Sequence, residues 1–230
     1  MDASRYSANI LSFGQEGQQK LLQSRAVVIG LGGLGGFVLE QLARIGVGHI
    51  VGADHDSFEA GNLNRQLLSG KSVIGRAKAL VAADRVSEIN PSIAFTAHHG
   101  PFQSLDESVF RDADVVFDCL DSIPERRELA ARCDSAAVVL IHGAICGWNG
   151  QVGVCPPGAD MVSKLYDGKQ AGAEKKHGNL VFTAARAASE MVAEGMKIVL
   201  DIEPPRPRIR FFDMKTGETE TYREGRPGVE

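Results

Sequence analysis

The stretch that decides the fold is "RAVVIGLGGLGGFVLEQLARIG", residues 25–46. Its first residues are apolar and lead directly into Gly30, a pattern typical of a strand buried on both faces of a parallel sheet. Apolar side chains then recur at helical spacing, at Leu34, Val38, Leu42 and Ile45. The sequence therefore predicts a strand, a tight glycine turn and a helix in direct succession.

The glycine turn carries a phosphate-binding pattern. Gly30, Gly32 and Gly35 fit G-x-G-x-x-G, and Gly33 adds a fourth glycine to the loop. Glycines let the backbone approach a phosphate, whose charge is met by free amides at the start of the helix. Asp54 follows 19 residues after Gly35, where a carboxylate can accept hydrogen bonds from ribose hydroxyls. These residues predict an adenine-nucleotide site.

Strand and helix patterns then alternate along the chain, which predicts an α/β fold: a Rossmann-like, doubly wound, mostly parallel sheet. Ligands of such sheets lie beyond the carboxyl ends of the strands. Ser122 and Glu125 read as a capping box that opens one of the helices. The expected strands are 25–30, 49–54, 93–99, 113–121, 137–145 and 150–155, and the expected helices are 34–45, 75–90 and 123–137.

We expect a single nucleotide-binding domain over residues 1–230. Residues 1–24 are expected to form a helical arm, and a helix is expected from about 180 to 200. The segment 156–178 is rich in glycine and lysine without clean periodicity, which indicates a mobile crossover loop over the site. Residues 207–223 predict a C-terminal β-hairpin that turns at Lys215, Thr216 and Gly217.

Composition narrows the class of protein. The 230 residues are 43% hydrophobic and 23% charged, which is enough apolar sequence for one core. A net charge of -4 gives no general basic surface, so a nucleic-acid partner is not expected. No apolar run approaches the roughly 20 residues of a membrane span, so we expect a cytoplasmic protein. The four cysteines form no C-x-x-C pair, so no zinc site is predicted.

A second group of residues carries more phosphate chemistry than a dinucleotide needs. Asn62, Arg65 and Gln66 follow in one loop after Asp54, and Lys78 begins the next helical pattern. Arginine offers a planar fork to phosphate oxygens and lysine a compact charge, and both can neutralise charge that develops during displacement at phosphorus. The group favours a triphosphate over NAD. A nicotinamide-dependent dehydrogenase is also disfavoured because no proton-transfer residue is readable.

Two carboxylates end the strand predicted at 113–121. Asp121 lies beside the crevice, where it can hold Mg2+ against a triphosphate, because Mg2+ takes one or two carboxylates with phosphate oxygens and water. Asp118 is expected to turn into the strand environment. Asp121 is therefore the predicted metal ligand, and its alternative is a simple helix-cap acid.

These motifs together resemble the ThiF/MoeB/HesA family, relatives of the ubiquitin-activating enzymes. The resemblance extends from Arg5 to Val154 and resumes weakly at "SEMVAEGMKIVL". Its most specific part is "DHD" followed by "NLNRQ". The motifs that carry it are "RYS", "GQEGQQKL", "GLGGLG", "DHD", "NLNRQ", "GRAKA", "INP", "DCLDS" and "GWNGQV".

The resemblance implies a reaction and the roles of residues. ATP and Mg2+ would bind at the sheet edge, and the C-terminal glycine of a ubiquitin-like sulfur carrier of the MoaD/ThiS type would attack the α-phosphate, for molybdopterin or thiamine sulfur transfer. Gln66 would support its loop and Asp56 would belong to the nucleotide site. The other implied roles are ribose for Asp54, phosphates for Asn62 and Arg65, triphosphate for Lys78 and magnesium for Asp121. Arg65, Lys78 and Asp121 are thus the expected catalytic residues.

The sequence departs from the family pattern at three points. Ala8 stands where the family usually has an arginine that reaches the triphosphate of the neighbouring subunit of a homodimer, although Arg5 is kept. The zinc-binding C-x-x-C pairs are missing. The segment 156–178 has no cysteine, so only Cys155 could capture a carrier covalently. We therefore predict adenylation without covalent capture.

Two further functions stay open at this stage. Ala8 is compatible with a catalytically weakened nucleotide-binding subunit that needs an arginine-bearing partner. A relative that adenylates a transfer-RNA nucleoside is the other, because the crossover segment has local positive charge from Lys164, Lys169, Lys175 and Lys176. The favoured interpretation of these lysines is that they face solvent or meet an acidic carrier tail.

Overall fold

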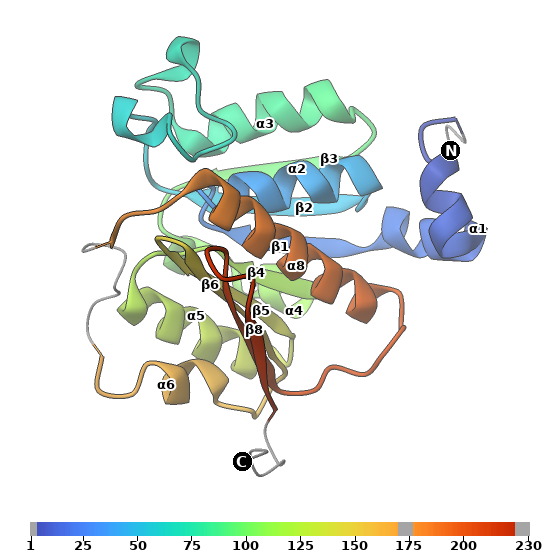
Figure 1. The fold of residues 1–230 in the computed structure, drawn as a ribbon. Helices are drawn as coiled ribbons and strands as arrows, with labels where there is room; N and C mark the ends of the chain where they lie inside the picture. The colour runs from blue at the N-terminus through green and yellow to red at the C-terminus, as the bar shows by residue number, and fades with distance from the viewer. Residues whose placement is uncertain (1–3, 170–176, 224–230) are drawn as a thin grey trace.

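The computed structural model describes residues 4–169 and 177–223. These residues form an eight-stranded sheet in the order β3-β2-β1-β4-β5-β6-β7-β8. Helices cover both faces of this sheet (Figure 1). The strands are β1 (Arg25–Ile29), β2 (His49–Asp54), β3 (Ala94–His99), β4 (Val115–Asp118), β5 (Leu140–Cys146), β6 (Asn149–Cys155), β7 (Arg208–Asp213) and β8 (Thr219–Arg223).

The helices alternate with the strands in the first half of the chain and become sparse in the second. The α-helices are α1 (Ser7–Gln23), α2 (Gly35–Ile45), α3 (Lys78–Ile89), α4 (Glu107–Arg111), α5 (Ile123–Ser135), α6 (Met161–Leu165) and α8 (Val181–Val199). Short 3-10 helices are η1 (Ala60–Asn62), η2 (Lys71–Val73) and η3 (Phe102–Ser104).

The sheet has a parallel half and an antiparallel half. Strands β3, β2, β1, β4 and β5 run parallel, whereas β5, β6, β7 and β8 pair antiparallel. The predicted doubly wound, mostly parallel α/β fold with a C-terminal hairpin is therefore confirmed. In the hairpin, Gly217 has φ 82°, a backbone conformation that suits glycine at the turn.

Strand β1 joins the two layers of the core. Val28 packs into the core on the side of α2, α3 and α8, and Val27 and Ile29 pack into the core on the side of α4 and α5. All three side chains are at most 1% exposed. Each such burial stabilises the fold by roughly 1.5–3 kcal/mol, so the apolar run before the glycine loop holds that loop in a fixed place.

Helix α8 lies across the antiparallel half of the sheet because small residues let it approach closely. A Cβ added to Gly143 of β5 would lie 2.2 Å from the Met191 sulfur of α8, and one added to Gly195 would lie 2.6 Å from the Phe117 ring. Ala184 and Ala187 on the same helix are fully buried. The small-residue pattern of this helix thus serves packing onto the sheet.

Several predicted boundaries are corrected. Ser122 is the N-cap residue of α5 but its side chain makes no capping hydrogen bond, so the expected capping box is wrong. Glu125 lines the pocket. The strand predicted over 113–121 ends at Asp118, and the helix predicted to reach residue 137 ends at Ser135.

The crossover segment 156–178 is only partly a loop. Helix α6 lies within it, with Val162 and Tyr166 buried four residues apart, and this spacing explains a short helix that clean periodicity did not reveal. Lys164 and Lys169 are described, whereas Lys175 and Lys176 lie outside the described residues.

The N-terminal helix α1 begins beside the amino end of β3. Tyr6 is buried and its hydroxyl accepts from the Asn90 amide at 2.6 Å. Arg5 donates to the Ile89 carbonyl at 2.6 Å. The helix bends at Gly14, with φ 74°. Among the described helices, none is long and apolar enough to cross a membrane.

Candidate active site

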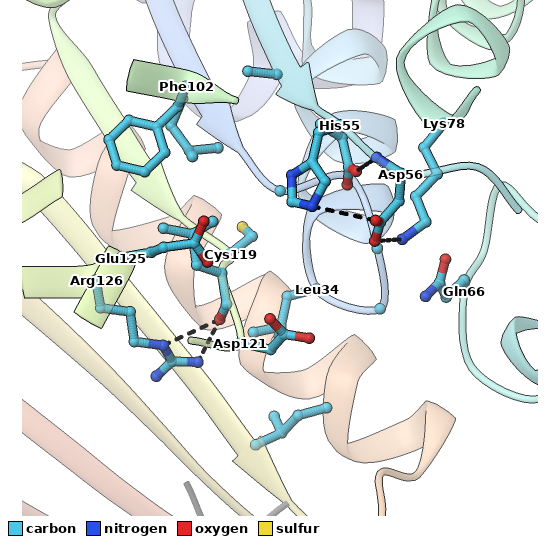
Figure 2. A pocket seen from close by; sticks show the side chains of 18 of the residues that line it. Leu34, His55, Asp56, Gln66, Lys78, Phe102, Cys119, Asp121, Glu125 and Arg126 are labelled. Carbon is cyan, nitrogen blue, oxygen red and sulfur yellow. Dashed lines mark hydrogen bonds and ion pairs between the residues drawn. The ribbon is translucent and has the colours of Figure 1, made fainter. Parts of the chain in front are cut away.

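A pocket opens at the carboxyl ends of the parallel strands, where the sequence predicts the ligand site (Figure 2). The strands β1, β2 and β4 end there, and the loops that follow them form its walls. Most of the predicted site residues line it: Gly30, Gly32, Gly33, Asp54, Asp56, Arg65, Gln66, Lys78 and Asp121. Within the described part of the chain, Gly35 and Asn62 stand outside this lining.

The glycines of the loop divide into two that shape the turn and two that leave room. Gly30 has φ 88°, and a Cβ on Gly35 would lie 1.7 Å from the Gly30 carbonyl oxygen, so both positions are fixed by the backbone itself. A Cβ on Gly32 or Gly33 would instead point toward Gln66 at 3.4 Å or Arg65 at 3.8 Å. Gly32 and Gly33 therefore leave a cradle open on the pocket side.

Asp54 fastens the second strand end to the glycine loop. One carboxylate oxygen accepts from the Leu31 amide at 2.7 Å, and the other accepts from the Asp56 amide at 2.8 Å. Each oxygen keeps a further lone pair, so the carboxylate can also accept from a sugar hydroxyl. Asp54 thus holds the loop and faces the pocket at once.

Lys78 and Asp56 form an ion pair in the pocket wall. The Lys78 ammonium lies 2.8 Å from the Asp56 carboxylate, and the Lys78 side chain is only 8% exposed. Burial raises the pKa of Asp56, but the hydrogen bond and charge of Lys78 outweigh it and the pKa is lowered overall. His55 adds a contact to Asp56 at 3.3 Å. Lys78 is thereby held at the pocket as a cation.

Arg65 and Gln66 come from the loop that faces the cradle, but Asn62 does not reach it. The Arg65 guanidinium donates to the Gly61 carbonyl at 3.0 Å, which leaves donors of its fork free to turn toward a ligand. Among the described residues, nothing hydrogen-bonds the buried Oε1 of Gln66. The Asn62 side chain instead accepts from the Glu59 amide and caps η1.

Asp121 is exposed at the pocket edge, where its carboxylate is open to a cation. A separate cluster of possible metal ligands, Asp54, His55 and Asp56, lies in the opposite wall. That cluster is less suited to a cation, because the Lys78 ammonium already pairs with Asp56 and would repel a second positive charge. Asp121 is therefore the better candidate for a magnesium ligand.

Asp118 is fully buried and points away from the pocket, as the sequence analysis expects. Its carboxylate lies 2.6 Å from Nδ1 of His142, the residue directly opposite it on β5. Burial lowers the pKa of His142, and the hydrogen bond to Asp118 only partly offsets this. The ring is therefore neutral near pH 7, with its proton on the nitrogen that faces Asp118.

Sequence reasoning missed two groups of pocket residues. The first is apolar and comes from β1, β2 and η3, namely Ile29, Ala53 and Phe102. The second is Arg126 on α5, whose guanidinium donates hydrogen bonds to the Leu120 carbonyl (Figure 2).

Asp118 and His142 are polar residues within neighbouring apolar strands. This pattern was the sign in the sequence that could have indicated a buried pair.

The buried thiols of Cys119, Cys133 and Cys155 are poor nucleophiles. Burial raises the pKa of Cys155 to about 12 and raises that of Cys119 well above its usual value. A thiol attacks as its thiolate, so a buried thiol with a raised pKa is inert. Cys155, the candidate for covalent capture of a carrier, is therefore poorly suited to that role.

Neither N-terminal residue in question lies in this chain's own pocket. Ala8 is exposed on α1, and Arg5 is bound to the end of α3. Ala8 therefore leaves the pocket of its own chain unchanged.

The glycine loop, the acid at the end of β2 and the cations around the cradle define a nucleotide-binding α/β protein. The model of the ThiF family matches residues 6–228. The chain therefore belongs to the ThiF family, and it is an adenylyltransferase of that family.

Several known adenylyltransferases and activating enzymes are similar to the chain in sequence. The chain is 35% identical over 225 residues to the sulfur carrier protein ThiS adenylyltransferase of Escherichia coli (strain K12), covering 94% of this chain and 89% of that protein. It is 33% identical over 229 residues to the SAMP-activating enzyme E1 of Haloferax volcanii, covering 95% and 85%. It matches the E. coli molybdopterin-synthase adenylyltransferase at 35% over 153 residues, which cover 65% of this chain and 61% of that protein.

Solved structures agree on the fold. The crystal structure of E. coli MccB with ATP superposes with a TM-score of 0.78 at 22% identity, covering 98% of this chain and 73% of that chain. MccB with MccA-N7isoASN superposes with a TM-score of 0.81 at 20% identity. At this identity the likeness concerns the fold.

Proposed function

We propose that the protein adenylates the C-terminal glycine of a small ubiquitin-like sulfur carrier of the ThiS or MoaD type, using ATP and Mg2+. The observation that carries the proposal is the cradle beside Gly32 and Gly33, faced by the side chains of Arg65 and Gln66. The named activities of the ThiS and SAMP relatives support the kind of partner.

The pocket fits ATP at both of its ends. The apolar end, with Ile29, Ala53 and Phe102, suits the base, and Asp54 lies beside it with lone pairs for the ribose hydroxyls. The cradle lies toward Arg65 and Lys78, whose charges suit phosphate oxygens. The buried Oε1 of Gln66 has no hydrogen-bond partner among the described residues. A donor from water or from a bound ligand would satisfy this acceptor.

Asp121 would hold Mg2+, which supplies charge neutralisation between the phosphates when bound. Its carboxylate is exposed at the edge of the pocket opposite Lys78 and Asp56. This residue follows shortly after β4, which ends at Asp118 and whose four residues are all buried, so the segment that carries Asp121 starts from a fixed point. The position favours one metal ligand from the protein and the rest from phosphate and water.

The reaction needs no nucleophile from the protein. An oxygen of the carrier's terminal carboxylate forms a bond to the α-phosphorus, the bond between that phosphorus and the bridging oxygen breaks, and pyrophosphate leaves with the electron pair. Arg65 and Lys78 stabilise the charge that develops on the phosphate oxygens. The chain's contribution is positioning and charge, as nucleotidyl transfer requires.

The test is carrier-dependent exchange of labelled pyrophosphate into ATP. We expect exchange with a carrier ending in Gly-Gly, loss of exchange when its last glycine is deleted, and loss in Asp121→Ala and Arg65→Ala. Absence of exchange with ThiS-type and MoaD-type carriers alike would overturn the proposal. The carrier that supports the fastest exchange identifies the pathway.

A second candidate is a weakened subunit that depends on an arginine-bearing partner. The exposed position of Ala8, away from its own pocket, favours it. Ala8→Arg is then expected to raise exchange by about tenfold or more in a homodimer, because a cation that acts at the transition state contributes on the order of 1–3 kcal/mol. Unchanged exchange in a variant shown to be dimeric by light scattering would remove this candidate.

A further inference from the structure

A closed ring of hydrogen bonds lies behind Asp121. The Leu120 amide donates to Oδ1 of Asp118 at 3.0 Å, and Oδ2 of Asp118 accepts from Nδ1 of His142 at 2.6 Å. Nε2 of His142 lies 3.0 Å from the Tyr166 hydroxyl. Arg126 donates from one nitrogen to that hydroxyl and from two others to the Leu120 carbonyl. The ring therefore returns to the residue where it began.

The ring fixes the peptide next to the predicted magnesium ligand. Both backbone polar groups of Leu120 are held, the amide by Asp118 and the carbonyl by Arg126. Leu120 immediately precedes Asp121, so these contacts determine where the Asp121 carboxylate can reach. Asp118 and His142 are completely buried, and Arg126 and Tyr166 are at most 7% exposed, which makes the geometry hard to deform.

One member of the ring comes from a different part of the fold. Asp118, Leu120 and Arg126 belong to β4 and the segment that leads into α5, and His142 belongs to the neighbouring strand β5. Tyr166 instead follows α6 in the crossover segment. Its hydroxyl also accepts from the Gln151 amide of β6 at 2.7 Å, and its carbonyl accepts from Arg127 of α5.

We propose that Tyr166 is a positioning residue that couples the docking of α6 in the crossover segment to the placement of Asp121. The hydroxyl links Arg126 to His142. The other connection that the described residues provide between these two side chains runs through Leu120 and Asp118. The Arg126 guanidinium also lies 5.5 Å from the centre of the Tyr166 ring, which holds the pair together further. This inference rests on the proposed function, because it assigns Asp121 to the metal.

The test is Tyr166→Phe, with Tyr6→Phe as a matched control. Each change removes one hydroxyl that accepts a hydrogen bond from a buried or half-buried side-chain amide, but Tyr6 lies at the amino edge of the sheet. ATP affinity is measured by calorimetry with Mg2+ and, separately, in EDTA. Thermal unfolding of each variant shows how much stability is lost, which separates folding from positioning.

We expect the gain in ATP affinity on adding Mg2+ to fall by about tenfold in Tyr166→Phe, with affinity in EDTA unchanged, because contacts behind a metal ligand commonly contribute 10- to 100-fold to metal binding. Tyr6→Phe should keep the full gain. Arg126→Lys should also lower the gain on adding Mg2+, since one ammonium nitrogen replaces the three guanidinium nitrogens that hold Leu120 and Tyr166.

Two results would overturn the inference and they are distinguishable. If Tyr166→Phe and Arg126→Lys both keep the wild-type gain with Mg2+ while Asp121→Ala loses it, the coupling is wrong and the proposed function stands. If the wild-type protein shows no ATP binding or no gain with Mg2+, the proposed function fails and the coupling fails with it. If either Tyr166→Phe or Arg126→Lys is too unstable to titrate, the result of the other variant decides between these outcomes.

Discussion

The two walls of the pocket differ in what their polar groups contact. The wall of the glycine loop, with Gly32, Arg65 and Lys78, holds charges and open space that face the pocket. The wall formed after β4, with Leu120 and Arg126, has its polar groups bound to one another within the protein. The first wall is built to bind a ligand and the second to keep one carboxylate, Asp121, in place.

The largest expected effect is on catalysis, at the carboxylate that the second wall positions. Asp121→Ala should reduce adenylation by about 100-fold or more, because a charge that acts on the transferred phosphate is lost. Its melting temperature should change little, since the side chain is exposed. Asp84→Ala is the matched control and should keep full activity. Asp84 is also an exposed aspartate, and it lies on α3, where it pairs with Arg76. Equal loss in both variants would contradict the assignment.

The two kinds of glycine in the first wall allow a matched pair of variants. Gly35→Ala places a Cβ 1.7 Å from a backbone oxygen and should destabilise the protein by about 4 kcal/mol or more. The methyl group of Gly32→Ala would point into the cradle, so the melting temperature should stay within about 2 °C of the wild-type value. The ATP affinity of this variant should nevertheless fall by roughly 5- to 100-fold through overpacking. A Gly32→Ala protein that binds ATP normally would show that the cradle is not the phosphate site.

These predictions depend on features that were readable from sequence to different degrees. The glycine loop and Asp54 were readable because a strand, a turn and a helix follow one another within residues 25–46 and their chemistry is local. The resemblance implies that Asn62 binds phosphate, whereas in the structure its side chain caps its own 3-10 turn. The spacing of a loop does not say which side chain turns inward.

The second wall could not be read because its contacts join distant segments. His142 meets Asp118 only through the pairing of β4 with β5, and Tyr166 meets Arg126 across 40 residues of sequence. The expected Ser122–Glu125 capping box is absent as well, and Glu125 lines the pocket. Tertiary contacts decided the first two cases.

A smaller effect is expected in the buried pair of the second wall. Asp118→Asn keeps an acceptor for His142 but replaces the other carboxylate oxygen, which accepts from the Leu120 amide, by a donor. The free energy of unfolding should fall by about 1–3 kcal/mol, the usual cost of a buried polar group without its partner. Urea unfolding monitored by circular dichroism measures this change. No change would mean that the pair does not stabilise the wall.

The smallest expected effect is a change in the pKa of Asp56, in the first wall. Lys78 lowers the pKa of Asp56, so the pair stabilises the folded state above the unfolded-state pKa of about 3.9, and this contribution is lost as the pH falls through the folded value. Lys78→Met should raise the pKa of Asp56, as measured by a carboxyl NMR titration. The acid side of the stability curve should become shallower, because the contribution that the wild type loses as the pH falls through the folded pKa of Asp56 is then absent at every pH. An Asp56 pKa that stays low would assign the shift to another group.

The most direct measurement follows the phosphorus atom that is transferred. The protein is incubated with Mg2+, a carrier ending in Gly-Gly and ATP labelled at either the α- or the γ-phosphate. Label from the α-position should appear on the carrier, and it should be absent when Asp121→Ala replaces the wild type. Label from the γ-position on the carrier, or none from the α-position although ATP binds, would contradict the account.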